Sequence, residues 1–115
     1  MKKLIFFITL HKDDEKNGFY IYKYSDKYSN RNDPFNEIIN FSSTKGKICN
    51  KKFIYKNISN NGIIDHPKND GFFSEWMFNR GVPLCACIEI PDKIKLKNRI
   101  NIVSELIDYI IRIKL

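Results

Sequence analysis

The chain has 115 residues, of which 43% are hydrophobic and 14% are aromatic. This length and composition predict a single domain over residues 1–115 with a sizeable core, and they exclude a disordered or fibrous protein. The net charge of +7 comes mostly from scattered lysines rather than from a compact arginine stripe, so it disfavours nucleic acid as a partner. The positive charge nevertheless keeps open one function, that of a non-catalytic basic module that binds nucleic acid.

The cysteines indicate a reducing compartment. Cys49, Cys85 and Cys87 are odd in number and lack the spacing of a disulfide framework, which favours a cytoplasmic location. The apolar run near the first residue is short and leads into charged residues, so it predicts a core strand rather than a secretory signal. No run reaches the length of a transmembrane helix, and we expect no membrane partner. A Cys85-x-Cys87 metal pair is conceivable, but buried small side chains are the favoured interpretation.

The first half of the chain predicts two extended segments and a helix. Residues 3–10 are apolar on both faces, as in a strand in the middle of a sheet. Residues 19–24 are aromatic and β-branched, which favours a second extended segment. Asp33-Pro34 indicates the start of a helix that ends near Ser43, with Asp33 as its N-cap. Residues 44–70, rich in lysine and asparagine, are expected to be irregular.

The second half predicts a short helix over residues 72–80, with Trp76 in the core, and Gly81 as its end. Residues 84–91 follow as a strand. The last helix, residues 98–114, should cover a sheet face with a broad apolar stripe made of Ile100, Val103, Leu106, Ile107, Ile110 and Ile111. The fold class is therefore α/β, a partial mixed sheet flanked by helices. Only two strands are clear, so the sheet resembles part of a larger one.

Two polar residues in apolar runs are the candidate site. His11 directly follows the run 4–10, and Glu89 lies inside the run 84–91. Burying a carboxylate without a partner is costly, and ligands of open α/β sheets bind at the carboxyl ends of strands. The pair therefore predicts a metal site with a general base, although one histidine and one glutamate do not complete a zinc site. A structural role, with Glu89 paired to Arg80 or Arg99, stays open.

Several motifs together resemble a known family. They are Leu10-His11-Lys12-Asp13-Asp14 with Gly18-Phe19-Tyr20-Ile21-Tyr22, then Gly71-Phe72-Phe73-Ser74-Glu75-Trp76, Arg80-Gly81-Val82-Pro83 and Ile88-Glu89-Ile90-Pro91. In their order and spacing they are similar to the C-terminal part of M14-type zinc carboxypeptidases. The similar branch includes the succinylglutamate desuccinylase and aspartoacylase relatives. The closing helix agrees as well, and the resemblance covers nearly the whole chain.

The resemblance implies a hydrolase, a metallopeptidase with zinc as its cofactor. It implies that His11 is the third zinc ligand and that Glu89 activates the water and then protonates the leaving group. A metal-activated water would attack the carbonyl of a peptide or of an acylated amino acid.

The chain also departs from the family. The upstream His-x-x-Glu ligand element is missing, since His66 is followed by Pro67-Lys68-Asn69, and the arginine and asparagine that hold the substrate carboxylate have no match. Lys12 stands where the branch usually has a glutamate. We therefore expect an incomplete domain that is inactive alone. Its partners would be a missing N-terminal half or a second copy of the chain, and a substrate only after complementation.

Overall fold

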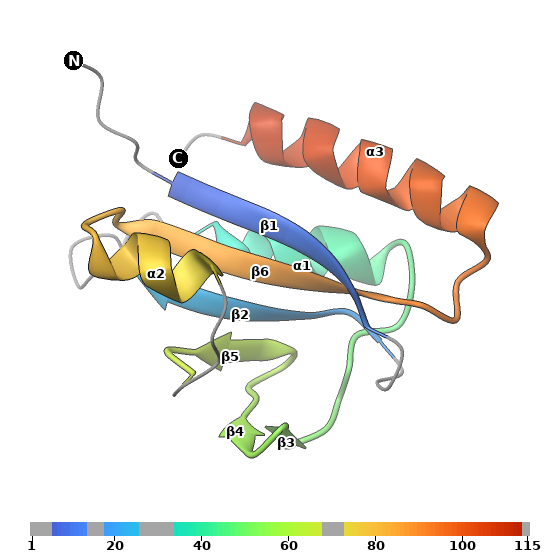
Figure 1. The fold of residues 1–115 in the computed structure, drawn as a ribbon. Coiled ribbons are helices and arrows are strands. Elements are labelled where there is room, and N and C mark those ends of the chain that lie inside the picture. Colours follow the sequence, from blue (N-terminus) through green and yellow to red (C-terminus); the bar gives the residue numbers. More distant parts are fainter. Residues whose placement is uncertain (1–5, 14–17, 26–33, 68–72, 114–115) are drawn as a thin grey trace.

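The computed structural model describes residues 6–13, 18–25, 34–67 and 73–113. It is the mixed α/β arrangement that the sequence predicts, a sheet flanked by helices (Figure 1). In chain order the elements are β1 (Phe6–Asp13), β2 (Tyr20–Ser25), α1 (Phe35–Ser43), β3 (Phe53–Ile54), β4 (Asn57–Ile58), β5 (Ile63–Asp65), α2 (Phe73–Asn79), β6 (Leu84–Pro91) and α3 (Leu96–Arg112).

The strand β6 organises the sheet. The strand order is β1-β6-β2-β5, in which β6 pairs parallel with β1 and antiparallel with β2. All eight residues of β6 are buried, which explains why its sequence is apolar on both faces. Among the described residues, β1 has no strand on its outer side. The expectation that this apolar strand lies in the middle of a sheet is therefore wrong for the part of the chain described, where it is an edge.

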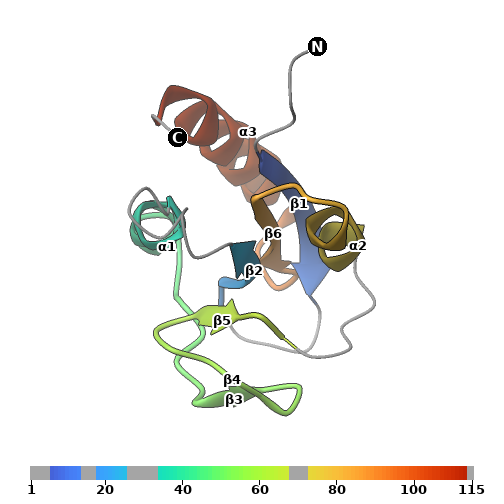
Figure 2. The same ribbon diagram turned by 90° about the vertical axis from the view of Figure 1, so that its left-hand side faces the viewer.

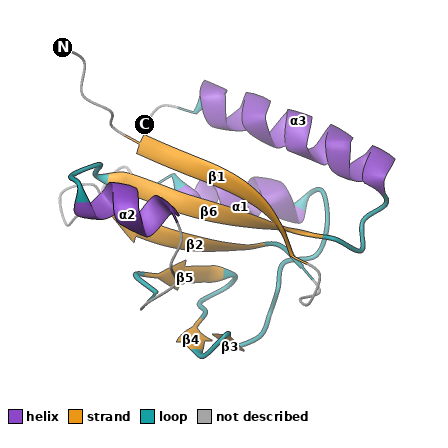
Figure 3. Cartoon of the chain, viewed as in Figure 1, coloured by secondary structure: helices purple, strands orange, loops and turns teal. Residues whose placement is uncertain are grey.

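Helices cover the two faces of the sheet unequally. Figure 2 shows α1 and α3 on one side and α2 on the other, and Figure 3 shows the same layers by element type. The larger core lies under α1 and α3, where Phe35 and Leu106 pack against Ile21 and Ile88 of the sheet. On the other face α2 covers only one end of the strands. The opposite end of that face is lined by Tyr20, Tyr22 and Cys87 with residues of the 49–64 segment.

The sheet has more strands than the two that the sequence makes clear. β5 pairs parallel with β2, and β3 and β4 form a separate small hairpin. Residues 44–70 are therefore not simply irregular. Strands of two or three residues are too short to give a periodic signal, which is why the sequence does not predict them. A turn lies at Asn61-Gly62, with positive φ at both residues.

Two expectations about buried helix faces are wrong. Trp76 is not in the core, because its side chain on α2 is 45% exposed and stacks on Phe73. The buried stripe of α3 is formed by Ile102, Leu106 and Ile110. Other members of the expected stripe, such as Ile100 and Ile111, are exposed, because α3 carries apolar residues on two adjacent faces and this sheet covers only one.

The ends of the helices agree in part with the sequence. The predicted N-cap Asp33 lies outside the described residues, and Pro34 is the N-cap of α1. Gly81 follows α2 with a φ of 99°, as expected for the residue that ends a helix. In the described part of the chain, no helix combines the length and the apolar character needed to cross a membrane.

Gly18 generates a stability prediction. Two backbone hydrogen bonds hold residues 47–49 against the residue before β2. Phe19 N–H donates to Lys47 O at 2.8 Å, and Cys49 N–H donates to Phe19 O at 2.9 Å. A Cβ at position 18 would lie 2.5 Å from the backbone nitrogen of Cys49. We expect Gly18→Ala to lower the free energy of unfolding by about 1–3 kcal/mol, measured by urea denaturation.

Asn50→Ala is the control, since Asn50 is exposed on the same segment and should change stability by no more than roughly 0.5 kcal/mol. Equal stability of Gly18→Ala and wild type would contradict the close approach of these two backbones.

Candidate functional site

The two residues that the sequence singles out lie side by side. His11 and Glu89 are direct partners in the parallel pairing of β1 with β6, near the carboxyl end of each strand. Residues opposite one another in adjacent strands project from the same face, and His11 Nδ1 lies 3.7 Å from Glu89 Oε1. The structure therefore brings the pair together, through strand pairing between segments that are far apart in the sequence.

The site has a buried floor and an exposed rim. The Glu89 side chain is 6% exposed, whereas the His11 side chain is 45% exposed. A buried carboxylate needs polar partners to offset the loss of its hydration. Glu89 has the His11 imidazole on its solvent side and a second polar group beneath it, the thiol of Cys87.

Cys87, for which the sequence favours a core role over a metal-binding one, also lies at this site. Its Sγ donates a hydrogen bond to Glu89 Oε1 at 3.4 Å. The nitrogen, sulfur and oxygen atoms of His11, Cys87 and Glu89 that could bind a metal all lie within 4.8 Å of one another. The spacing in the sequence indicates that Cys87 and Glu89 project from the same face, because residues two apart in a strand do so. It was not decisive, since buried cysteines are usually small core residues, as Cys85 is here.

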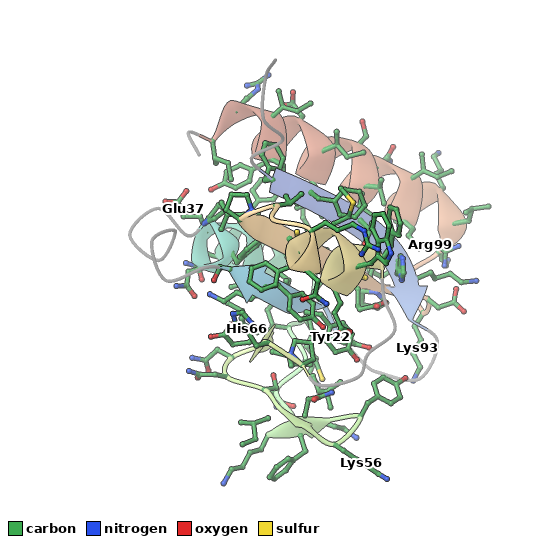
Figure 4. All side chains as sticks on the ribbon, turned by 60° about the vertical axis from the view of Figure 1, so that its left-hand side comes forward. Tyr22, Glu37, Lys56, His66, Lys93 and Arg99 are labelled. Atoms are coloured by element: carbon green, nitrogen blue, oxygen red, sulfur yellow. The ribbon has the colours of Figure 1, made fainter. Side chains whose placement is uncertain are left out.

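Aromatic side chains surround the floor of the site. In the antiparallel pairing of β2 with β6, Tyr20 lies opposite Glu89 and Tyr22 lies opposite Cys87. Both tyrosines are buried, and their rings contact edge to face with centroids 5.5 Å apart. Figure 4 shows Tyr22 on the sheet face that looks toward the β3–β4 hairpin. The Glu89 carboxylate and the Cys87 thiol thus lie in surroundings of low polarity, where electrostatic interactions are stronger than in water.

A charged cluster holds the ends of three elements together beside His11. Asp92, just after β6, binds Lys12 of β1, with Nζ and Oδ1 3.4 Å apart, and also binds Arg99 of α3. Desolvation raises the pKa of the Asp92 carboxyl, but the hydrogen bonds and charges of Arg99 and Lys12 outweigh it and leave this pKa below its ordinary value. The cluster keeps His11 and Glu89 in register, because it joins the residues that follow them.

The arginines considered as structural partners of Glu89 have other contacts. Arg99 binds Asp92, and the Arg80 guanidinium stacks on the Trp76 ring at 3.5 Å from its centroid. Arg99 lies near the carboxyl end of β1 (Figure 4). The observed charge partner of Glu89 is thus His11, the residue expected to share its site.

Two cavities differ in their relation to this site. A pocket of about 210 Å³ lies at the strand ends and includes His11, Lys12 and Arg99 in its lining. A larger one of about 600 Å³ lies between α1 and the 48–61 segment, and neither His11 nor Glu89 lines it. The smaller pocket reaches His11, but neither Glu89 nor Cys87 lines it, and its cationic side chains, Lys12 and Arg99, already bind Asp92.

His66 has a packing role. Its Nε2 lies 2.9 Å from Ser25 O, and its ring contacts Tyr24 and Phe78 edge to face. Figure 4 shows it at the opposite end of the strands from Arg99. It is a partly exposed residue after β5, and its Nε2 also lies 3.6 Å from Asp65 Oδ1.

Comparison with solved structures relates the fold to metallopeptidases. The chain is similar to candidate metallopeptidases from Shewanella amazonensis SB2B (TM-score 0.71, 16% identity), Shewanella denitrificans OS217 (0.66, 22%) and Shewanella baltica OS155 (0.74, 17%). The matches cover 91%, 88% and 90% of this chain but only 39%, 37% and 38% of those proteins. No protein-family model and no curated protein matches the chain. The chain thus has a metallopeptidase-like fold and spans less than two fifths of the length of its structural neighbours.

Cys85, the other cysteine of β6, leads to a prediction about pH. Burial raises the pKa of the Cys85 thiol from 9.0 to about 11. Above pH 9 the unfolded chain therefore binds fewer protons at this position than the folded chain, and the free energy of unfolding should fall as pH rises from 9 to 11. Urea denaturation across this range should show a shallower fall for Cys85→Ala than for wild type. Equal slopes for the two proteins would contradict the assignment.

Proposed function

We propose that this chain is the C-terminal part of a zinc-dependent carboxypeptidase-like hydrolase of the M14 type. The observation that carries the proposal is the pairing of His11 with the buried Glu89 at the carboxyl ends of two parallel strands. A metallopeptidase-like fold over nine tenths of the chain supports it. The substrate class is a peptide or an acylated amino acid.

The donor atoms at the site fit zinc. Imidazole nitrogen, carboxylate oxygen and thiolate sulfur are the ligands that Zn²⁺ takes in proteins, and the site offers one of each. In this proposal the exposed His11 imidazole holds the ion. When bound, zinc would lower the pKa of a water molecule and polarise the substrate carbonyl.

Glu89 is the general base of the proposed reaction. Its carboxylate would accept a proton from the attacking water and deliver it to the leaving nitrogen. Its neighbours support this role: the Cys87 S–H and the His11 ring contact one oxygen, Oε1. These contacts orient the carboxylate.

Catalysis needs more than this chain provides. Catalytic zinc sites normally have three protein ligands, and the sequence contains no His-x-x-Glu element. Since the chain spans less than two fifths of its structural neighbours, we propose that a second polypeptide segment supplies the missing ligands.

Two surfaces support a docking position for that segment. The outer edge of β1 has no strand partner within the described part of the sheet. Next to it, α3 exposes an aliphatic stripe at 44–75% exposure, made of Leu96, Ile100, Ile107 and Ile111. A strand edge beside an apolar stripe is a surface that associates with another polypeptide. Without the missing segment, we expect a second copy of the chain to bind there.

A chimera tests the proposed activity. This chain would replace the matching section of one of the Shewanella proteins, so that the remaining three fifths supplies the other ligands. The zinc-loaded chimera should hydrolyse blocked peptides or N-acyl amino acids. Glu89→Gln should lower kcat by at least about 100-fold without loss of zinc, because it removes the base alone. His11→Ala should lose zinc, as measured by atomic absorption.

The chimera also carries its own controls. Glu105→Gln removes a carboxylate from α3, away from the site, and should leave kcat unchanged. A folded, zinc-loaded chimera that hydrolyses neither substrate class would overturn the proposed function. Full activity of Glu89→Gln would overturn the role of Glu89.

The exposed stripe generates an association prediction. By sedimentation velocity, the 13.7 kDa chain should form dimers or larger species, and the double variant Ile100→Lys with Ile107→Lys should shift it toward the monomer. Charging the stripe removes its apolar contact and adds repulsion between copies. Asn98→Lys with Asn101→Lys is the matched control, since it adds the same charge at exposed positions of α3. A monomeric wild-type chain would contradict the prediction.

A further inference from the structure

We propose that His11, Cys87 and Glu89 together bind a thiophilic divalent cation, such as Zn²⁺, Cd²⁺ or Co²⁺, in this chain alone, with the Cys87 sulfur as a direct ligand. The proposed hydrolase function needs a second segment and assigns no ligand role to Cys87. The present inference does not rest on that function. It concerns the chain without a partner.

Two of the three donor-atom separations are close to those of a tetrahedral metal site. With zinc bonds of about 2.0–2.2 Å to nitrogen or oxygen and about 2.3 Å to sulfur, tetrahedral ligand atoms lie about 3.4–3.6 Å apart. The Cys87 sulfur lies 3.4 Å from Glu89 Oε1, and His11 Nδ1 lies 3.7 Å from the same oxygen. The sulfur and the nitrogen also lie within 4.8 Å of each other. Binding of an ion would therefore keep the two contacts of Glu89 Oε1 near their present length and bring the sulfur and the nitrogen within tetrahedral distance of each other.

The charges of the site balance for a divalent ion. The bound state would combine a thiolate, a carboxylate and a neutral imidazole, whose summed charge of about −2 neutralises the cation in a region of low polarity. As the metal–sulfur bond forms, the Cys87 proton passes to the solvent, and the hydrogen bond from that proton to Glu89 is lost. The metal then takes the place of the proton between sulfur and oxygen.

The three residues differ in exposure, and the exposed one marks the side from which an ion can enter. Cys87 is fully buried and Glu89 is 5% exposed, so they form the floor of the site. The His11 side chain is 45% exposed and is the one ligand at the surface. An ion would therefore enter past the imidazole. Tyr20 and Tyr22 line the floor on the β2 side and keep the thiol surroundings rigid and apolar.

Cobalt titration of the reduced chain tests the site. A Co²⁺ ion bound to a thiolate gives a sulfur-to-metal charge-transfer absorption in the near ultraviolet, which imidazole and carboxylate sites do not give. We expect this band to saturate at one ion per chain with a micromolar or tighter dissociation constant, and Zn²⁺ to displace the cobalt. Cys87→Ser should abolish the band, and His11→Ala should weaken binding by at least about tenfold.

Cys85→Ser is the matched control. Cys85 is buried on the same face of the same strand, but its Sγ contacts Val82 O rather than a carboxylate. The band should persist in this variant and in Cys49→Ser. No band in the wild-type chain, or a band that survives Cys87→Ser, would overturn the inference.

Circular dichroism of each variant separates loss of metal from loss of fold. Should Cys87→Ser not fold, the exposed His11→Ala variant still decides, because unchanged affinity in that variant would overturn the site. The result is also distinct from that of the chimera. If the chain lacks a thiolate–cobalt band while the chimera is active with Glu89 as its base, only the metal site of the chain alone fails. If the band is present and the chimera is inactive, only the proposed hydrolase function fails.

Discussion

The burial of one carboxylate is the constraint on which the rest of this structure depends. Glu89 lies in β6, a strand that is covered on both faces and paired on both edges. A carboxylate in that position loses most of its hydration and requires polar contacts close at hand. The structure provides them from two directions, the His11 imidazole on the neighbouring strand and the Cys87 thiol two residues earlier on the same strand.

The direction of the neighbouring strands determines what Glu89 meets. Because β1 runs parallel to β6, its carboxyl end lies beside the carboxyl end of β6, and His11 falls opposite Glu89. Because β2 runs antiparallel to β6, the first residue of β2, Tyr20, lies opposite Glu89 near the carboxyl end of β6. One edge of Glu89 thus faces a polar, exposed group and the other a buried aromatic one. This asymmetry creates a site that opens on one side only.

Much of this arrangement could be predicted from the sequence, and the exceptions have physical reasons. The apolar runs that His11 follows and that contain Glu89 predicted both strands, and the structure places these two residues side by side. The three residues of β5 gave no usable periodicity, and Trp76 on α2 was assigned to the core although it is 45% exposed. The local sequence pattern shows that a residue is apolar. It does not show whether another part of the chain packs against that residue and buries it.

That same limit explains two further errors. The strand predicted for the middle of a sheet lies at an edge, and the broad stripe predicted to be buried on α3 is half exposed, at positions such as Ile100 and Ile107. Both segments have the sequence of elements covered on more sides than the described residues cover. The matches to the structural neighbours cover less than two fifths of those proteins.

The measurement that tests the account most directly is a double-mutant cycle between His11 and Glu89. The free energies of unfolding of wild type, His11→Ala, Glu89→Gln and the double variant would be compared in the absence and presence of zinc. If the two side chains form one site, their effects should be non-additive by roughly 0.5–3 kcal/mol, and zinc should enlarge the coupling. Effects that add to within about 0.3–0.5 kcal/mol in both conditions would contradict the shared site.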